Sequence, residues 1–204
     1  MLIVAIAGGS GSGKTTVAEQ LHNLVLESGY SCANLCEDRY YHSLNKQQLA
    51  NISDVDFDHP DAINHHQLSV DLANLQQGKT IEAPHYCYKT HQQLPQSTPL
   101  PPTDVFILEG LHLLHRTILL PHYDETIFVD TPTEVRLQRR VDRDVKERQR
   151  TVKSVTEQFY KTVEPAHSEF IQPSKANAGI VVDGTQPLDQ LMPFISKRVF
   201  NKLS

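Results

Sequence analysis

The sequence Gly8-Gly9-Ser10-Gly11-Ser12-Gly13-Lys14-Thr15 lies between a short apolar run and a segment with helical spacing. The run from Leu2 to Ala7 is almost continuously apolar, as expected of a strand buried on both faces. From Lys14 to Ser28 the apolar residues recur at helical spacing, and Gly29 is a natural stop. These segments predict a strand, a glycine-rich loop and a helix, in that order.

The loop matches the pattern G-x-x-x-x-G-K-[ST], which binds the phosphates of a nucleoside triphosphate. Its glycines let backbone N–H groups converge on phosphate oxygens, and the following helix adds the positive end of its dipole. Lys14 would reach the β- and γ-phosphates, and the Thr15 hydroxyl would ligate Mg²⁺. We expect the nucleotide-binding residues to be Gly8, Gly9, Ser10, Gly11, Ser12, Gly13, Lys14, Thr15 and Thr16. A Rossmann dinucleotide loop is disfavoured, because the glycine spacing does not fit and Lys14-Thr15 would have no role.

Apolar runs alternate with helical patterns along the rest of the chain. The runs that predict buried strands are Ser31–Glu37, Val105–Glu109, Thr126–Asp130 and Gly179–Asp183. Ile63–Gln77 has helical spacing, and the capping box Thr131-Pro132-Thr133-Glu134 opens a second helix that continues to about Arg148. This alternation predicts a single three-layer α/β/α domain of the P-loop NTPase class over residues 1–204, with a mostly parallel five-stranded sheet.

Residues 81–102 are the best candidate for an insertion in this domain. Thr80–Tyr86 is compatible with one strand of a small hairpin. Pro95–Thr103 holds four prolines and little regular pattern, which predicts an irregular surface connection. The C-terminal stretch is weakly helical, and Pro193 argues against a single long helix there.

Bulk composition excludes several classes of protein. The 204 residues carry a formal net charge of −5, so no basic excess points to nucleic acid. No apolar run reaches the roughly 18 residues that a membrane span needs. The first residues lead straight into the glycine-rich loop without a basic leader, and the three cysteines form no CxxC pair. We therefore expect a cytoplasmic protein whose cysteines are small buried apolar side chains.

Two carboxylates follow predicted strands, at the edge where ligands bind in open α/β sheets. Asp38 comes directly after the second strand, and Glu109 ends the run Val105–Glu109. Asp38 is placed to accept a proton from an attacking hydroxyl or to help hold the metal, although a turn or helix cap would also explain it. Glu109 is placed to bind Mg²⁺ directly or through water, because an acid after four apolar residues is costly without a partner.

The helix after Thr131 carries an arginine stripe. Its predicted apolar face is Leu137, Val141 and Val145. Arg136, Arg140 and Arg143 cluster on another side, within about 60° of arc. Arg148 and Arg150 follow where the helix is expected to end. A solvated charged face paired with Asp144 and Glu147 would explain these arginines, and so would a mobile lid over about residues 140–165 that contacts a transferring phosphoryl group.

The 11 histidines form no HExxH motif and no cysteine–histidine spacing for zinc. We expect His65-His66 on an exposed helix surface. The segment His85-Tyr86-Cys87-Tyr88-Lys89-Thr90-His91 mixes aromatic and polar side chains in the predicted insertion. Aromatic faces with hydrogen-bonding tips suit a nucleobase pocket, and an ordinary amphipathic hairpin explains the pattern equally well.

Several further motifs extend over most of the chain. They are Asp38-Arg39-Tyr40-Tyr41, Phe57-Asp58-His59-Pro60-Asp61-Ala62, Leu108-Glu109-Gly110, Phe128-Val129-Asp130-Thr131, Arg139-Arg140-Val141-Asp142-Arg143-Asp144 and Glu147-Arg148-Gln149-Arg150. Together with the glycine-rich loop, they make the sequence from Ile3 to about Val182 resemble the uridine kinase (uridine–cytidine kinase) family. The FDHPDA box is the most specific of these motifs.

This resemblance implies a transfer of the γ-phosphoryl group of ATP (or GTP), with Mg²⁺, to the 5′-hydroxyl of uridine or cytidine. Asp38 would be the general base, with Lys14 and Arg143 also in the catalytic set. The acceptor would be bound by residues from several segments: Asp58 and Arg140 at the ribose, Tyr41, Tyr86 and His91 at the pyrimidine, and Gln158 at a further contact. Arg143, Arg148 and Arg150 would contact phosphates from the lid, and Thr15, Glu109 and Asp38 would hold the metal. The family also forms homotetramers.

Three departures from the family pattern bear on base preference and substrate affinity. Gln93 stands where the family often has Arg or Lys, Gln149 stands where Gly is usual, and the pocket segment reads His85-Tyr86-Cys87-Tyr88. A related kinase for pantothenate, ribulose phosphate or nicotinamide riboside is the main alternative. A non-catalytic nucleotide-binding regulator is a second one, but no guanine-reading NKxD is present, and Lys14, Asp38 and Glu109 are all retained.

Overall fold

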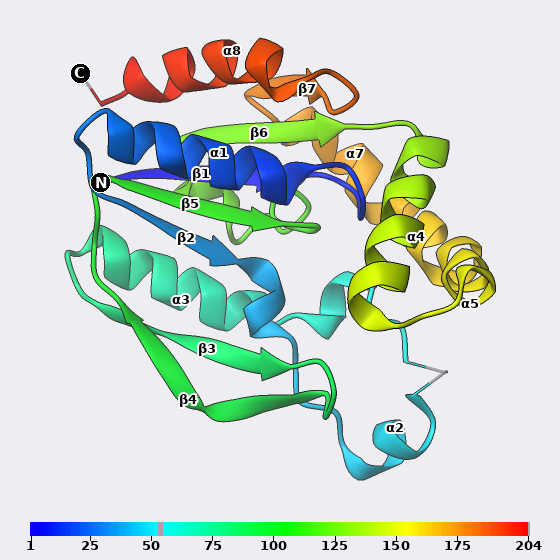
Figure 1. Ribbon diagram of the computed structural model, residues 1–204. Helices are drawn as coiled ribbons and strands as arrows, with labels where there is room; N and C mark the ends of the chain where they lie inside the picture. Colours follow the sequence, from blue (N-terminus) through cyan, green and yellow to red (C-terminus); the bar gives the residue numbers. More distant parts are fainter. Residues whose placement is uncertain (53–54, 204) are drawn as a thin grey trace.

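A computed structural model describes residues 1–52 and 55–203 of the chain. Its main sheet has five parallel strands, as predicted, in the order β2-β5-β1-β6-β7 (Figure 1). Their bounds are β1 Leu2–Ala7, β2 Cys32–Cys36, β5 Val105–Gly110, β6 Glu125–Asp130 and β7 Ile180–Asp183. Cys36 and Glu109 are register partners, as are Ala7 and Gly110. The carboxyl ends of three neighbouring strands therefore meet at one edge.

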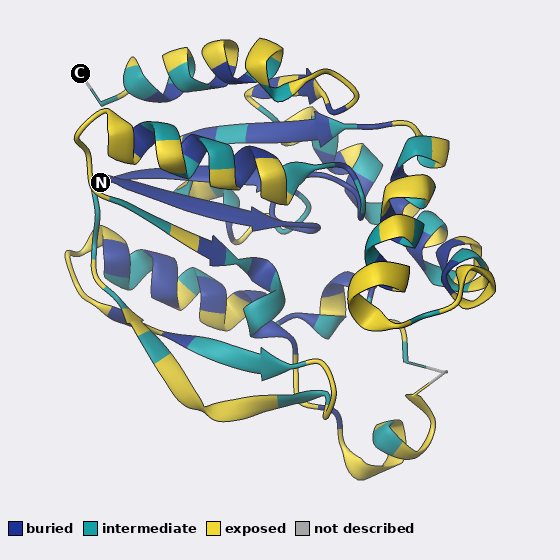
Figure 2. Cartoon of the chain, viewed as in Figure 1, coloured by how far each residue is buried: buried dark blue, intermediate teal, exposed yellow. Residues whose placement is uncertain are grey.

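Helices cover both faces of this sheet. Strand side chains alternate between two apolar clusters, as the period of two in a strand requires. One cluster joins Val4 and Ile6 of β1 to α1 (Lys14–Glu27) and α8 (Leu188–Phe200). The other joins Ile3 and Ala5 to α3 (His65–Gln76). Figure 2 shows β1 and β5 buried along their whole length between these layers.

The predicted insertion folds as a separate two-stranded antiparallel sheet of β3 (Ile81–Cys87) and β4 (Gln92–Leu100), beside α3 (Figure 1). The prediction of an irregular Pro95–Thr103 segment was wrong, because most of it belongs to β4. Both strands of a two-stranded ribbon are edges, so only part of the N–H groups are needed for the ladder. A strand of this kind tolerates prolines such as Pro95 and Pro99.

Short elements complete the chain. Before β5 these are η1 (Glu37–Tyr40), α2 (Lys46–Ala50) and η3 (Pro60–Ala62), and η4 (Leu120–His122) precedes β6. After β6 come α4 (Thr133–Arg148), α5 (Val152–Gln158), η5 (Phe159–Val163), α6 (Glu164–Ala166), η6 (His167–Ile171), α7 (Gln172–Ser174) and η7 (Lys175–Asn177). Within the part of the chain that the structure describes, no helix is both long enough and apolar enough to cross a membrane.

Two predictions about α4 were wrong. The helix extends to Arg148 as expected, but no side chain caps its start. Instead of forming a capping box, the Thr131 hydroxyl donates to the backbone oxygen of Ser12 at 3.0 Å. The predicted apolar side is also incorrect, because Val145 is exposed while Arg136, Arg140 and Asp144 are buried. This helix packs its charged side inward, where the guanidiniums find backbone and carboxylate acceptors.

Two other expectations need correction. His65 is not on the surface, because its ring is buried against Glu37. Pro193 lies inside α8 without ending it. The carbonyl that this proline leaves unpaired belongs to the exposed Asp189, where water can serve as donor, and Met192 and Ile195 anchor the helix on the sheet.

Candidate functional site

The glycine-rich loop connects β1 to α1 at the carboxyl edge of the sheet. Gly11 and Gly13 adopt positive φ angles of 80° and 99°. The backbone oxygen of Ser12 accepts from Thr131 Oγ1 and also from Arg139 Nη1, at 3.1 Å. Side chains from α4 and the residue pair before it therefore hold the outer side of the loop by hydrogen bonds. Ser10 and Ser12 are buried, whereas Thr15 and Thr16 are exposed at the start of α1.

Gly11→Ala is expected to lower the free energy of unfolding by about 2–5 kcal/mol. Left-handed backbone costs a non-glycine residue about 1–2 kcal/mol, and overpacking adds about 1–3 kcal/mol. An added Cβ at Gly11 would lie 2.3 Å from the backbone oxygen of Arg136. Gly29→Ala is the matched control, because Gly29 has φ +84° but no atom within 4 Å of the added Cβ. Equal losses for the two variants in urea unfolding would contradict the close approach of α4 to the loop.

Glu109 and Asp38 lie close to the first residues of α1. Glu109 Oε2 accepts from Thr15 Oγ1 at 3.2 Å and lies 3.8 Å from Lys14 Nζ. Asp38, two residues beyond β2, accepts from the Tyr88 hydroxyl at 3.3 Å. Burial and the charge of Glu109 raise the pKa of Asp38 to about 6, against the opposing effect of Lys14. These contacts bring the predicted catalytic and metal-binding side chains together at the sheet edge.

The oxygen groups at this edge fit Mg²⁺. Mg²⁺ prefers hard oxygen ligands and is usually held by one or two carboxylates together with substrate phosphates and water. The Thr15 hydroxyl already contacts the Glu109 carboxylate, and Asp38 is near enough for its pKa to respond to Glu109. These three side chains would hold the ion, which would neutralise phosphate charge when bound there.

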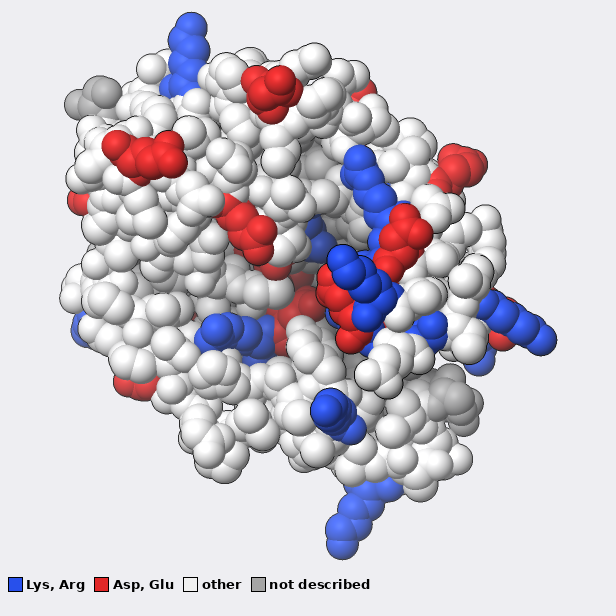
Figure 3. All heavy atoms as spheres, in the orientation of Figure 1, with Lys and Arg blue, Asp and Glu red and all other residues white. Residues whose placement is uncertain are grey.

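Four arginines of α4 and the residues after it form an Asp144 group, in which they converge on that fully buried carboxylate. The N···O distances to it are 3.7 Å from Arg140, 2.9 Å from Arg143, 3.5 Å from Arg148 and 3.6 Å from Arg150. Gln158 Oε1 accepts from Arg140 at 3.2 Å and from Arg150 at 2.5 Å. Figure 3 shows basic and acidic side chains gathered on the surface over α4, beneath which Asp144 is buried. Sequence reasoning gave Asp144 no site role, because its burial depends on how α4 packs.

Asp58 and Arg140 are both buried next to this group. Arg140 Nη1 donates to Ser10 Oγ at 2.8 Å, and Asp58 Oδ2 accepts from the Thr162 hydroxyl at 3.2 Å. Burial raises the pKa of Asp58, whereas the charge of Arg140 lowers it. Arg140 therefore contacts the glycine-rich loop and is near enough to the FDHPDA box for its charge to act on Asp58.

Aromatic side chains from three segments meet beside Asp58. The Tyr41 and Tyr86 ring centroids are 5.3 Å apart, and Phe57 stacks on His91 at 4.9 Å. The Tyr86 hydroxyl and His91 Nδ1 are buried without a hydrogen-bond partner among the described residues. Two polar atoms within an aromatic group can bind the edge of a planar ligand. Sequence reasoning missed Phe57 and Tyr88 as site residues, although both belong to segments that it singled out.

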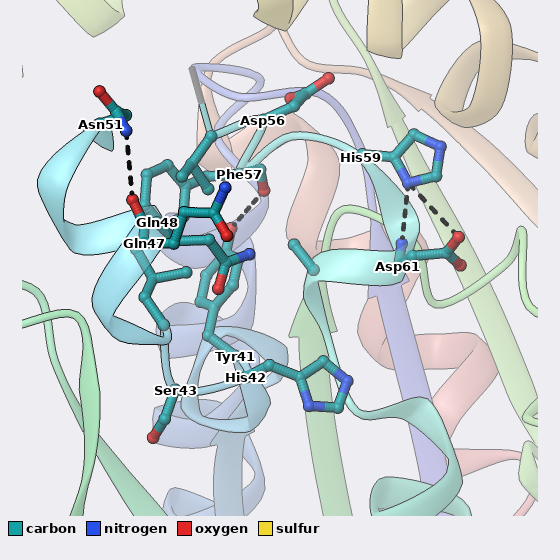
Figure 4. A pocket seen from close by; sticks show the side chains of 13 residues that line it. Tyr41, His42, Ser43, Gln47, Gln48, Asn51, Asp56, Phe57, His59 and Asp61 are labelled. Atoms are coloured by element: carbon teal, nitrogen blue, oxygen red, sulfur yellow. Dashed lines mark hydrogen bonds and ion pairs between the residues drawn. The ribbon is translucent and has the colours of Figure 1, made fainter. Parts of the chain in front are cut away.

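A cavity of about 750 Å³ adjoins this aromatic group (Figure 4). Tyr41 and Phe57 lie in its wall together with Gln47 and Gln48 of α2, but Tyr86 and His91 do not. The Tyr41 hydroxyl donates to the Phe57 carbonyl at 3.0 Å, which links two residues of the cavity wall. Gln93, at the position that departs from the family pattern, donates to the backbone oxygen of Tyr41 at 3.2 Å.

The chain is similar to known proteins both in fold and in sequence. A phosphoribulokinase from Rhodobacter spheroides has the same fold, with a TM-score of 0.64 at 16% identity over 92% of this chain and 73% of its own. A uridine kinase from Vibrio campbellii is 39% identical over 89% of this chain and 86% of its own. Uridine-cytidine kinase B from Dictyostelium discoideum is 34% identical over 99% of this chain and 84% of its own.

Uridine kinase-like protein 5 from Arabidopsis thaliana is 37% identical over 98% of this chain, which spans only 43% of that protein. The sequence profile of the phosphoribulokinase/uridine kinase family matches residues 3–189. That match includes the glycine-rich loop, both strand-end carboxylates and the arginines of α4. The chain therefore belongs to the phosphoribulokinase/uridine kinase family.

Proposed function

We propose that this protein transfers the γ-phosphoryl group of ATP (or GTP) to the 5′-hydroxyl of uridine or cytidine, giving UMP or CMP. The observation that carries the proposal is the position of Asp38. Its carboxylate accepts from Tyr88 of the aromatic hairpin segment, and it is near enough to Glu109 and Lys14 for the charges of both to shift its pKa. The names of the relatives from Vibrio campbellii and Dictyostelium discoideum agree with this acceptor class.

In this mechanism Asp38 takes the proton of the acceptor hydroxyl as the hydroxyl oxygen attacks the γ-phosphorus. A pKa near 6 leaves most of this carboxyl ionised at neutral pH and makes it a stronger base than an ordinary aspartate. Lys14 and the arginines of the Asp144 group stabilise negative charge on the transferred phosphoryl group and on the departing nucleoside diphosphate. Arg143, Arg148 and Arg150 contact the phosphates from a lid over about residues 140–165.

The acceptor side of the proposal assigns the ribose to Asp58 and Arg140 and the base to Tyr41, Tyr86 and His91. Both members of the first pair are buried, and a hydrogen bond to a buried charge discriminates strongly between a hydroxyl and a hydrogen. Gln158 completes the set by holding Arg140 and Arg150.

Asp58 gives the proposal a prediction about the sugar. We expect kcat/KM for uridine to exceed that for 2′-deoxyuridine by about 10²-fold, because a hydrogen bond to a charged group contributes about 1.5–3 kcal/mol. Asp58→Asn should bring this ratio below about tenfold. Asp61→Asn is the matched control in the same box, because the Asp61 side chain is 74% exposed and pairs with Arg116. Equal kcat/KM for the two nucleosides in the unaltered protein would exclude the ribose role of Asp58.

Other parts of the proposal concern the whole protein. We place it in the cytoplasm as a homo-oligomer, a tetramer by analogy with the family, that acts on a small-molecule nucleoside and on neither nucleic acid nor membrane. Cys32, Cys36 and Cys87 are free in the described residues, which suits a reducing compartment.

A coupled assay over a panel of acceptors tests the proposed function. The panel holds uridine, cytidine, nicotinamide riboside, pantothenate and ribulose 5-phosphate, each with ATP and with GTP. We expect turnover with at least one pyrimidine ribonucleoside and none with pantothenate or ribulose phosphate. Turnover confined to nicotinamide riboside, pantothenate or ribulose phosphate would replace the substrate claim, and nucleotide binding without any turnover would favour a regulator.

A further inference from the structure

Glu37 is a buried carboxylate that the proposed phosphoryl transfer does not use. Its side chain is fully inaccessible at the start of η1, directly before Asp38. Glu37 Oε1 lies 2.7 Å from His65 Nε2, and Oε2 accepts from the backbone N–H of His112 at 3.0 Å. A buried carboxylate is costly unless both oxygens are paired. Here each oxygen is paired with a different segment of the chain.

His112 extends this network to the FDHPDA box. Its Nε2–H donates to the backbone oxygen of Asp58 at 2.9 Å, and its ring is fully buried. His112 follows Glu109 by three residues, and Glu37 precedes Asp38 by one. The Glu37–His112 network therefore joins the three segments that carry Asp38, Asp58 and Glu109.

The contact between these segments is tight. A Cβ added at Gly110 would lie 2.2 Å from Glu37 Oε2 and 2.5 Å from the Glu37 Cβ. No side chain fits between the end of β5 and the start of η1 at this point. Glu37 consequently has little freedom to move, and neither does the peptide that leads into Asp38.

We propose that Glu37 and His112 are positioning residues that set the place of the acceptor nucleoside relative to Asp38. His112 holds the Asp58 backbone, and Glu37 holds His112 against the segment that carries Asp38. The inference rests on the proposed function, because it takes Asp58 as a ribose-binding residue. It assigns the network to the acceptor half of the site, since none of its hydrogen bonds reaches the glycine-rich loop.

The test measures KM for the acceptor and for the nucleotide separately. His112→Leu removes the bond to Asp58, and we expect it to raise KM for uridine by about tenfold or more, with KM for ATP changed by less than about twofold. The ratio of kcat/KM for uridine to kcat/KM for 2′-deoxyuridine should also fall in His112→Leu. His112→Gln keeps an N–H donor near the position of Nε2 and should restore KM for uridine to within about threefold of normal.

His122→Leu is the matched control. His122 is likewise hydrogen-bonded through its ring, to Ser69 and Gln76, but it lies just before β6, at the opposite edge of the sheet. The His122→Leu variant should be less stable, but the ratio of its KM for uridine to its KM for ATP should not change.

Glu37 is tested with a second pair of variants. Glu37→Ala loses both contacts, and we expect kcat/KM for uridine to fall by at least about tenfold. Glu37→Gln keeps an acceptor for the His112 N–H and can donate to His65, so it should stay within about threefold of normal. Thermal unfolding of each variant shows whether it is folded at the assay temperature.

Two outcomes would overturn the positioning role. One is an unchanged KM for uridine in folded His112→Leu, and the other is an equal rise in both KM values that His112→Gln does not reverse. A failure of the proposed function looks different, because the unaltered protein would then not turn over uridine. The same comparison would be made with whichever acceptor it does phosphorylate.

Discussion

Asp38→Asn is expected to lower kcat by about 10³-fold while nucleotide binding is retained, since a positioned general base contributes about 10²–10⁴-fold. The amide has the shape of the carboxylate and can still accept from the Tyr88 hydroxyl, but it cannot take a proton. Steady-state kinetics with uridine and a nucleotide-binding titration measure the two effects.

The pH dependence gives this prediction a second signature. The raised pKa of Asp38, about 6, means that the carboxylate gains its proton as the pH falls through 6. In the unaltered protein kcat/KM should therefore drop about tenfold per pH unit below that value. Asp38→Asn should lack this acid limb. Asp104→Asn is the control, because Asp104 is exposed just before β5, where it accepts from Ser31. Near-normal kcat in Asp38→Asn would exclude Asp38 as the base.

Lys14→Ala is expected to lower kcat by about 10²–10³-fold, the usual cost of removing one donor that stabilises developing charge. Lys14 Nζ faces Glu109 at 3.8 Å, and its charge lowers the pKa of Asp38. Its removal should also weaken nucleotide binding and shift the acid limb of the pH profile to higher pH, because Asp38 would lose that opposing charge.

Lys79→Ala controls for the loss of a lysine, since Lys79 is exposed after α3 and its amine donates to the neighbouring Gln77. Kinetics over the range pH 5 to 8 measure both effects of Lys14→Ala. A variant that keeps kcat within about tenfold of normal, with an unshifted acid limb, would contradict the phosphate role of Lys14.

The central sheet could be predicted because its strands are almost purely apolar. Leu2–Ala7 and Val105–Gly110 are buried at every position, so the runs themselves identify them. Strand β4 could not be found in this way, because all nine of its residues are half-buried or exposed and the strand forms by pairing with β3. A proline-containing strand that is held by pairing with its hairpin partner carries no alternation of apolar and polar residues.

The site was predictable where its residues form contiguous motifs. The glycine-rich loop, Asp38 and Asp58 belong to short segments whose chemistry can be interpreted locally. Asp144 and Glu37 could not be found, because each is a charged residue whose burial depends on partners that tertiary packing supplies. The inward face of α4 was misassigned for the same reason: a guanidinium beside a buried carboxylate takes the place of an apolar side chain there.

Phosphoryl transfer itself can be followed with ATP labelled in the γ-phosphoryl group, with uridine and with cytidine as acceptors and separation of the products. The proposed function predicts that the label appears in UMP or CMP, in amounts equal to the ADP formed, and that Asp38→Asn forms this product about 10³-fold more slowly. Label recovered only in inorganic phosphate or in unreacted ATP, from folded protein that binds nucleotide, would contradict it.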